Sequence, residues 1–301
     1  MKLVTFNKEH LGIVTDAGVV DVTDLAGLDA NFWPPVGMVR LIADFEALQP
    51  QLADAVASRE ARPLDSVRLE APVRWPNKVI AFPANYHAHI DEMKHGVGSG
   101  VISKYKANGQ GFFLKANSSI SGPNDAIVLP PLEGREIHHE CELAIIIGKR
   151  GRGIDAACSQ DYIFGFTCLL DMVVRGTEER VMRKSYDTFC PMGPWIVTAD
   201  EMGDFSAIKM SLTVNGELRQ SAVTRDLIVD IPEMIAMASA VTTLEPGDII
   251  ATGTPAGVGP VKDGDIIEIT IDGVGTMTLP VTSGTVGNHS VWNATKVPAS
   301  A

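Results

Sequence analysis

Hydrophobic and polar positions alternate in short runs at the start of the chain. Segments 2–6 (KLVTF) and 11–25 (LGIVTDAGVVDVTDL) have the period of two that is typical of strands, and Asp16-Ala17-Gly18 supplies a turn inside the second. From about Gly37 to Ser58, apolar residues recur at spacings of three and four, which predicts helix. Pro50 lies inside this stretch, and we expect it to divide the stretch into two helices.

A change of pattern follows this helical stretch. The run 61–78 (ARPLDSVRLEAPVRWPNK) is rich in proline and charge and has neither period, which indicates a linker. We therefore predict a small N-terminal α+β domain over residues 1–73, a larger domain over residues 74–282, and a polar C-terminal tail over residues 283–301.

Short strand patterns dominate the larger domain. One long helix is expected at 231–244 (IPEMIAMASAVTTL), and Asn215-Gly216 is a two-residue hairpin turn. Many short strands with few helices favour a mainly β, α+β fold, a mixed β-sandwich, barrel or roll, over a βαβ sheet. The expected strands are 78–82, 111–115, 126–130, 140–147, 161–170, the two arms of 208–223, 247–253 and the two arms of 264–281.

Composition narrows the class of protein. The chain has 301 residues, 45% of them hydrophobic, and a formal net charge of −12, which argues against a nucleic-acid-binding surface. Its four cysteines form no CxxC pair, so a reducing cytoplasm suits them better than secretion. No apolar run approaches the roughly 20 residues that span a bilayer, and the first residues lack the apolar stretch of a signal peptide. We expect a cytoplasmic protein with no membrane partner.

Two carboxylates lie at the start of a strongly apolar strand, in EIHHECELAIIIG (136–148). Side chains alternate along a strand, so Glu140 and Glu142 share one face and can converge on one cation. Asp171 ends another apolar strand, IFGFTCLLD, and would add a third oxygen ligand. An all-oxygen set is typical of Mg²⁺ or Mn²⁺ rather than zinc. The alternative is an ordinary edge strand with one solvated face.

The histidines beside this strand are competing ligands. His139 is expected to face away from Glu140, and His138 lies at the start of the strand. We therefore interpret His138 as a supporting or substrate-facing residue and His139 as structural.

A second group of polar residues is found in NYHAHIDEM (85–93). If a helix begins here, His89 and Glu92 are three residues apart and can touch. A carboxylate that holds one imidazole nitrogen makes the other a general base, although the same pair could be a simple surface contact. The glycine-rich segment that follows, with Gly96, Gly98, Gly100, Gly109 and Gly111, suits a mobile flap over a pocket or a solvated loop.

The third group is the loop TGTPAGVG (252–259). It lacks the Gly-Lys-Ser/Thr ending of a phosphate-binding loop, so nucleotide binding is not expected. The loop could offer backbone amides and the hydroxyls of Thr252 and Thr254 to a substrate, or it could only connect strands.

Together these motifs resemble the fumarylacetoacetate hydrolase family over roughly residues 75–282. The similarity lies in HHECELAIIIGK, DYIFGFTCLLDMVVR, KSYDTFCPMGPW and LEPGDIIATGTPAGVG, with NYHAHIDE upstream, in the order usual for that family. Two positions depart from it: Leu170 stands where many relatives have Asn, and Glu178 where fumarylacetoacetases carry Gln. These departures bear on the identity of the substrate more than on the metal.

The resemblance implies a β-sandwich roll, a homodimer and one Mg²⁺ or Mn²⁺ per subunit. It implies roles for three sets of residues: Glu140, Glu142 and Asp171 as metal ligands; His89, Glu92 and Lys184 in catalysis; and Tyr86, Arg175, Gly253, Thr254 and His138 in substrate binding.

The chemistry that the resemblance implies is metal-dependent hydrolysis of a carbon–carbon bond. An acylpyruvate-type β-diketo acid, of the kind found in aromatic catabolism, would give pyruvate and a carboxylic acid. Decarboxylation of an oxaloacetate-like acid and isomerisation of an unsaturated keto acid remain open alternatives, because they share an enolate. A non-catalytic metal-binding protein is the alternative from a different class.

Overall fold

The computed structural model describes residues 1–27, 33–95 and 107–287. Most of the glycine-rich segment expected to form a flap (96–106) and the end of the expected tail (288–301) lie outside the described residues. Within these ranges the chain is mainly β with seven α-helices, which confirms the predicted fold class. None of the helices in the described ranges is long and apolar enough to cross a membrane.

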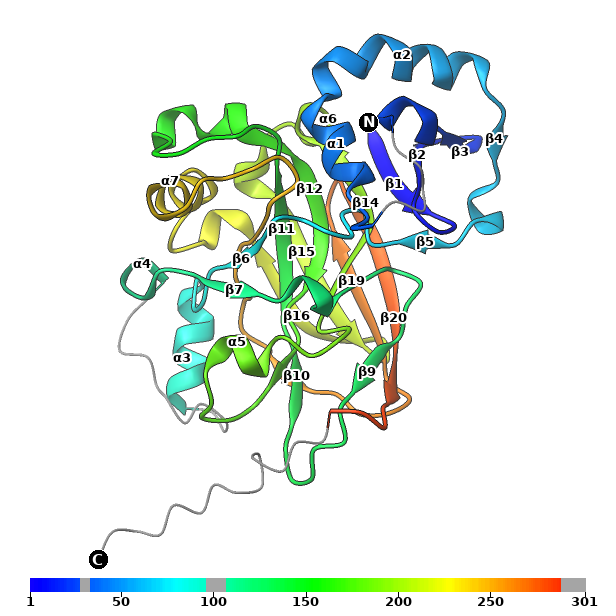
Figure 1. Ribbon diagram of the computed structural model, residues 1–301. Coiled ribbons are helices and arrows are strands. Elements are labelled where there is room, and N and C mark those ends of the chain that lie inside the picture. Colours follow the sequence, from blue (N-terminus) through cyan, green and yellow to red (C-terminus); the bar gives the residue numbers. More distant parts are fainter. Residues whose placement is uncertain (28–32, 96–106, 288–301) are drawn as a thin grey trace, which may run out of the picture.

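The largest sheet runs through the N-terminal segment and the rest of the chain (Figure 1). Strand β1 pairs with β14 through Lys2↔Val197 and Leu3↔Ile196, so backbone hydrogen bonds cross the predicted domain boundary, and the division near residue 73 stays a prediction. The strand order is β4 (Ala61–Arg62), β3 (Gly18–Asp21), β2 (His10–Thr15), β1 (Lys2–Phe6), β14 (Cys190–Thr198), β12 (Ile163–Leu170), β11 (Cys141–Ile147), β17 (Ile249–Ala251), β6 (Val79–Ala81) and β7 (Phe113–Lys115), with β5 (Leu69–Glu70) on β1 and β8 (Ile120–Ser121) on β14.

Two smaller sheets complete the β-structure of the described chain. The predicted hairpin turn joins β15 to β16, and both of its residues, Asn215 and Gly216, have the positive φ that such a turn requires. The five-stranded sheet has the order β16 (Glu217–Val223), β15 (Lys209–Val214), β19 (Ile266–Ile271), β20 (Gly275–Ser283) and β9 (Ile127–Leu129). The three-stranded sheet has the order β13 (Val173–Val174), β10 (Ile137–His139) and β18 (Gly259–Pro260).

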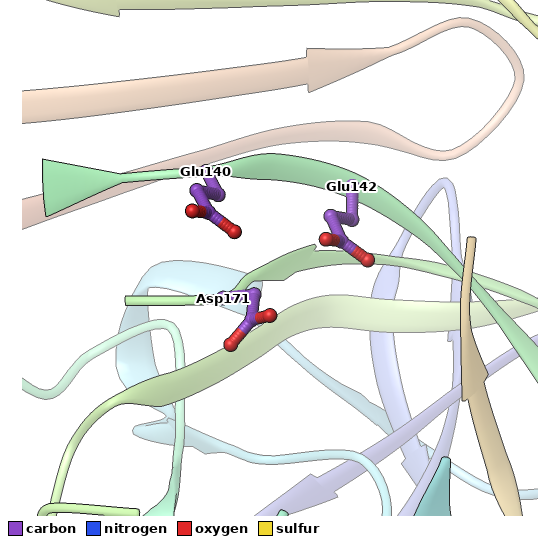
Figure 2. Close-up of side chains that lie close together, drawn as sticks. All are labelled: Glu140, Glu142 and Asp171. Carbon is purple, nitrogen blue, oxygen red and sulfur yellow. The ribbon is translucent and has the colours of Figure 1, made fainter. Parts of the chain in front are cut away.

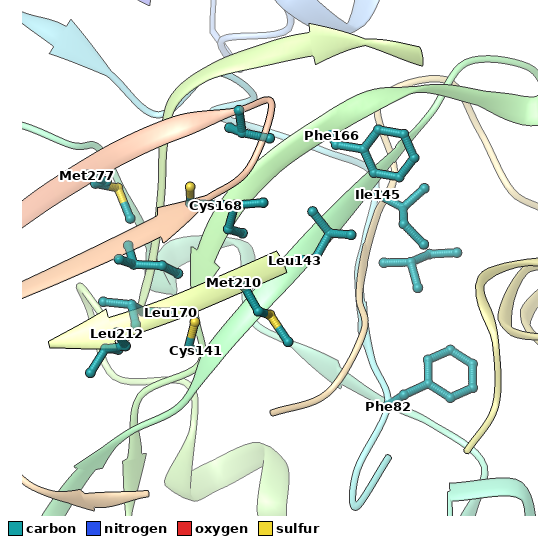
Figure 3. Close-up of a cluster of buried hydrophobic side chains, with 14 of the residues drawn as sticks. Phe82, Cys141, Leu143, Ile145, Phe166, Cys168, Leu170, Met210, Leu212 and Met277 are labelled. Atoms are coloured by element: carbon teal, nitrogen blue, oxygen red, sulfur yellow. The ribbon is translucent and has the colours of Figure 1, made fainter. Parts of the chain in front are cut away.

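Strand β11 separates two hydrophobic cores, because successive side chains point to opposite faces. Cys141, Leu143 and Ile145 pack in one core with Met210 and Leu212 of β15, as Figure 3 shows. Ala144 and Ile146 belong to the other core, with Leu41 and Ile42 of the N-terminal segment. Both faces of the strand are therefore buried, and a charge at its end has little access to bulk water.

The helices pack around these sheets and at their ends. Two helices form in the N-terminal stretch as predicted, but the break lies at Asp44 and not at Pro50. That part of the prediction was wrong: Pro50 and Glu46 are both exposed, so the carbonyl that loses its hydrogen bond can reach water. The helices are α1 (Gly37–Ala43), α2 (Phe45–Ser58), α3 (His87–His95), α4 (Ala107–Gln110), α5 (Arg180–Arg183), α6 (Ala199–Met202) and α7 (Ile231–Val241).

Helix α7 confirms the long helix expected after residue 230, although it ends at Val241. Asp230 and Glu233 form a capping box, which satisfies backbone N–H groups at its first turn. Short 3₁₀ helices connect the other elements: η1 (Thr23–Ala26), η2 (Leu64–Ser66), η3 (Asn117–Ser119), η4 (Ala156–Tyr162), η5 (Phe205–Ala207) and η6 (Thr224–Asp226).

Strand β14 was missed by the sequence patterns. Its prolines, Pro191 and Pro194, argue against an interior strand. The structure accommodates Pro194 at an interruption of the β12–β14 ladder, between the pairs Phe166↔Val197 and Cys168↔Gly193. A proline there removes no ladder hydrogen bond, so the strand continues past it.

Candidate active site

Three carboxylates converge at one end of the β11–β12 pair. The ladder places Cys141 opposite Leu170, so the next residues outward, Glu140 and Asp171, are also neighbours, and the Asp171 amide donates to the Glu140 carbonyl at 2.9 Å. Glu142 follows on the same face of β11. One oxygen from each of the three side chains lies within 4.8 Å of the others, and all three residues are buried (Figure 2). The structure brings the predicted trio together.

The carboxylates differ in how their charge is balanced. Burial, followed by repulsion from Asp171, raises the pKa of Glu142 well above its usual range. Burial also raises the pKa of Glu140, but Lys184 and Arg175 outweigh it and lower that pKa to about 2. The one hydrogen bond that Glu142 accepts within the described chain comes from the Gly253 amide at 2.8 Å. Glu142 is therefore the carboxylate that most needs a further positive charge.

Two buried lysines contact the trio. Lys184 Nζ donates to Glu140 Oε2 at 2.6 Å and also to Asp171. Lys115 Nζ donates to Asp171 Oδ1 at 2.5 Å and to the carbonyls of Lys184 and Phe189 at 2.7 and 3.1 Å. Sequence reasoning named Lys184 but missed Lys115. The signal was present, because Lys115 ends an apolar strand just as Asp171 does.

Replacing Lys115 with Met is expected to lower the free energy of unfolding of the metal-free protein by about 3–5 kcal/mol, because it breaks the buried ion pair with Asp171 and removes one hydrogen bond from each of two carbonyls. Urea unfolding in EDTA measures this change. The matched control is Lys149→Met, which removes an exposed ion pair to Glu46 and is expected to cost less than about 1 kcal/mol. Equal effects of the two substitutions would contradict a structural role for Lys115.

Helix α3 places His89 of the predicted His–Glu pair on the pocket wall. His89 Nδ1 lies 3.0 Å from Glu92 Oε2, and Glu92 Oε1 accepts from the Gly257 amide at 3.0 Å. Burial raises the pKa of Glu92, but the hydrogen bonds from His89 and Gly257 outweigh it, so its pKa is lowered. An ionised Glu92 favours the proton on Nδ1 and leaves Nε2 of His89 as the basic nitrogen.

Asn85 fixes the start of this helix. Its side chain donates to the carbonyls of Val229 and Thr252 and accepts from the Val229 amide, all within 3.0 Å. Asn85 begins the segment NYHAHIDEM, but no local pattern indicates that its side chain links three distant segments.

The loop after β17 uses its amides to hold the site's carboxylates. The Gly253 amide binds Glu142 and the Gly257 amide binds Glu92, while the Thr252 hydroxyl donates to the Leu143 carbonyl at 3.0 Å. Gly253 has a φ of 95°, and a Cβ there would lie 2.7 Å from that of Asn85. The amides of Gly253 and Gly257 and the hydroxyl of Thr252 thus already have hydrogen-bond partners. The substrate contact expected for Gly253 stays a prediction.

Thr254 and Tyr86 occupy different surroundings. Thr254 lines the pocket, and its hydroxyl accepts from Gln220 Nε2 at 2.8 Å. Tyr86 is packed in the hydrophobic core, and within the described chain its buried hydroxyl has no hydrogen-bond partner. Burial raises its pKa. Direct contact between Tyr86 and a substrate stays a prediction.

The two histidines support other side chains. His138 is buried, contacts Glu136 through Nε2 at 2.9 Å and accepts from Arg175 Nε at 3.0 Å. His139 Nδ1 lies 3.1 Å from Gln220 Oε1, and burial lowers its pKa to about 4, so it is neutral near pH 7. The structural role expected for His139 and a direct substrate contact for His138 both stay predictions.

A pocket of about 110 Å³ opens beside the trio. One water-sized sphere needs roughly 10–15 Å³, so the volume suits a small molecule. The ionisable side chains that line the pocket are Glu140, Glu142, Asp171, His89, Arg175, Arg180, Arg183 and Lys184.

Glu178, one of the two departures from the family pattern, pairs with a neighbouring arginine. It forms a two-point pair with Arg135, at 2.9 and 3.1 Å, and Arg135 also donates to the Arg175 carbonyl. This pair anchors the segment that carries the pocket's arginines.

The trio has the chemistry of a site for a hard divalent cation. Its three donors are carboxylate oxygens, which suit Mg²⁺ and Mn²⁺, and they lie close enough to share one ion. Burial and, after it, repulsion from Asp171 raise the pKa of Glu142, and an ion bound by the trio would offset both.

A buried, all-oxygen carboxylate trio in one pocket with a histidine held by a glutamate is typical of a metal-dependent enzyme. The family description "Fumarylacetoacetate (FAA) hydrolase C-terminal" matches residues 78–282. The chain belongs to this family.

Known proteins similar to the chain include relatives that differ in activity. It is 42% identical to maleylpyruvate hydrolase of Aquipseudomonas alcaligenes over 94% of this chain and all of that protein. It is 53% identical to the crystal structure of maleylpyruvate hydrolase from Sphingobium sp. SYK-6 in complex with manganese(II) and pyruvate, with a TM-score of 0.85 over 95% of this chain and all of that one. It is 36% identical to a mitochondrial oxaloacetate tautomerase of Rattus norvegicus, over 92% of this chain and 90% of that protein.

Proposed function

We propose that this protein is a metal-dependent hydrolase that cleaves a carbon–carbon bond in an acylpyruvate. The products are pyruvate and a carboxylic acid. The observation that carries the proposal is His89, held by Glu92, on the wall of the pocket that the carboxylate trio also lines. The similarity to two maleylpyruvate hydrolases, one solved with manganese(II) and pyruvate, supports it.

Glu140, Glu142 and Asp171 are assigned as ligands of one Mg²⁺ or Mn²⁺ per subunit. When bound, such an ion acts as a Lewis acid that stabilises negative charge on the keto-acid oxygens, an effect worth several kcal/mol. Lys115 and Lys184 hold Asp171 and Glu140 in place for it.

His89 is assigned as the general base. Glu92 holds its Nδ1–H, so Nε2 accepts a proton from a water molecule in the pocket. The oxygen of that water adds to the acyl carbonyl remote from the carboxylate of the pyruvate unit. General-base catalysis of this kind contributes about 10²- to 10⁴-fold.

The bond that breaks joins the attacked carbonyl carbon to the methylene carbon of the pyruvate unit. Its electron pair stays with the methylene carbon, which takes up the proton held by His89 and becomes the methyl group of pyruvate. The water oxygen remains in the carboxylic acid. Lys184 and Arg175 line the pocket beside the trio and add fixed positive charge where negative charge develops.

Roles in substrate binding are assigned to Arg175, Thr254, Tyr86, Gly253 and His138, with small keto acids as the ligands. Arg175 and Thr254 line the pocket. The other three act through their neighbours: Gly253 holds Glu142, His138 holds Arg175, and Tyr86 packs beneath the start of α3. Maleylpyruvate, an intermediate of aromatic catabolism, is the first substrate to test.

The alternatives have weaker support. The oxaloacetate tautomerase relative is less similar than the two maleylpyruvate hydrolases, and proton transfer or decarboxylation would need no base for water. The protein is also proposed to be a homodimer and to lie in the cytoplasm. Light scattering measures the oligomeric state.

The test is a panel of maleylpyruvate, other acylpyruvates and oxaloacetate, assayed for pyruvate release with Mn²⁺, with Mg²⁺ and with EDTA. The expected result is release of pyruvate from acylpyruvates that falls at least 100-fold in EDTA and returns when Mn²⁺ is added. Equal activity in EDTA, or turnover of oxaloacetate alone, would contradict the proposed hydrolase.

A further inference from the structure

The pocket wall has more positive charge than the carboxylate trio can balance. Three carboxylates and four cationic side chains, Arg175, Arg180, Arg183 and Lys184, line it. A divalent cation at the trio would add two further positive charges. An anionic substrate with a single carboxylate leaves much of this charge unmatched.

Two of the arginines already have structural partners. Arg175 Nε donates to His138, and its Nη1 lies 3.6 Å from Glu140 Oε1. Arg183 donates to the carbonyls of Glu178 and Val174 at 2.8 and 3.2 Å. Both therefore hold the shape of the pocket.

Arg180 is different. Its hydrogen bond within the described residues goes to the neutral amide oxygen of Gln110, at 3.0 Å. Its guanidinium carbon also lies 5.2 Å from the ring centre of Phe113. Burial lowers the pKa of Arg180, against the attraction of Glu140 and Asp171. Arg180 is half-buried, and no carboxylate is paired with it in the part of the chain that the structure describes.

Arg180 lies within reach of the trio for a short dicarboxylate. Lys184 Nζ, which contacts Glu140 and Asp171, lies 5.5 Å from the centre of the same Phe113 ring. The distance between Arg180 Cζ and Lys184 Nζ therefore cannot exceed the sum of their two distances to the centre of the Phe113 ring. The terminal carbons of a seven-carbon diacid are joined by six bonds of about 1.5 Å, which span at most roughly 9 Å.

We propose that Arg180, with Gln110 beside it, binds a second carboxylate at the far end of the substrate, so that the enzyme is specific for dicarboxylic acylpyruvates. The inference rests on the proposed function, since it concerns the substrate of the same site. Arginine suits this role because its planar fork can bind both oxygens of a carboxylate.

Succinylpyruvate and butyrylpyruvate form a matched pair of probes. Both contain seven carbons and the same β-diketo acid, and they differ in a terminal carboxylate against a terminal methyl group. The wild-type protein with Mn²⁺ is expected to show kcat/KM about 10- to 150-fold higher for succinylpyruvate, the range expected for one charge-assisted hydrogen-bonded pair. Arg180→Gln is expected to abolish most of this ratio, mainly through a higher KM for succinylpyruvate.

Two further variants define the effect. Arg180→Lys keeps the charge but not the fork and is expected to restore part of the ratio. Arg150→Gln removes an exposed arginine paired with Glu245 and is expected to leave the ratio unchanged. Thermal unfolding and Mn²⁺ binding report whether each variant folds. A wild-type ratio near one, or a full ratio in folded Arg180→Gln, overturns the proposal.

A binding experiment separates this inference from the proposed function. Calorimetry compares succinate with butyrate on wild-type and Arg180→Gln protein loaded with Mn²⁺. A preference for succinate of about tenfold or more that disappears in Arg180→Gln supports the carboxylate site even if neither acylpyruvate releases pyruvate, a result that would refute only the hydrolase. Equal binding of the two acids to the wild-type protein overturns the Arg180 site.

Discussion

Replacing Glu142 with Gln is expected to lower metal-dependent kcat/KM at least 10³-fold while leaving the fold intact. Glu142 supplies one of three oxygens that lie within 4.8 Å of one another, and loss of the Lewis acid they hold removes several kcal/mol of transition-state stabilisation. Of the trio, Glu142 has no lysine partner among the described residues, and burial raises its pKa. Neutralising it therefore breaks no ion pair, and the metal-free protein should remain as stable as the wild type.

The measurements are steady-state pyruvate release, calorimetric titration with Mn²⁺, and urea unfolding in EDTA. Glu142→Ala is expected to lose the same activity. Glu268→Gln, which neutralises an exposed carboxylate on β19, is the control and should change none of the three. Unchanged turnover and Mn²⁺ affinity in Glu142→Gln would refute the ligand assignment.

Removing the base should give the second largest effect. His89→Asn and Glu92→Gln are each expected to lower pyruvate release about 10²- to 10⁴-fold, with Mn²⁺ affinity within about threefold of the wild type. The two residues act as one unit through the Nδ1–Oε2 contact of 3.0 Å. The double variant should therefore lose little more than either single variant.

His87→Asn is the matched control, since His87 lies exposed at the start of the same helix, and it should retain wild-type activity. Glu92→Ala should also spare metal binding and remove hydrolysis. If Glu92→Gln still decarboxylates oxaloacetate while hydrolysis is lost, the two reactions use different proton transfers. Loss of Mn²⁺ binding in His89→Asn would contradict a role confined to the base.

The trio could be predicted because strand alternation is a local rule. Glu140 and Glu142 share a face in any strand, and Asp171 drew attention as a charge that ends an apolar run. Their meeting depends on the β11–β12 register, which pairs Cys141 with Leu170 across a distance in sequence that no local pattern encodes. The resemblance to a family supplied that link.

Other features escaped the sequence for physical reasons. Lys115 could have been noticed by the same rule as Asp171, but its partners come from residues about 55 to 75 positions away. The amides of Gly253 and Gly257 bind carboxylates on β11 and α3, and a sequence pattern cannot show which acceptor a backbone donor meets. Pro50 was expected to end a helix but lies inside α2, because at this exposed position water can reach the carbonyl that loses its hydrogen bond.

The pairing of β1 with β14 gives the N-terminal segment a protective role. Strand β14 lies next to β12, which leads to Asp171; β8 covers its first residues, and without β1 its far end, at Ile196 and Val197, would be an open edge. Open edges invite pairing with foreign chains and aggregation. The region matched by the family description, residues 78–282, contains β14 but not β1. By pairing with β14, strand β1 thus protects this part of the catalytic sheet from edge-to-edge pairing with strands of other molecules.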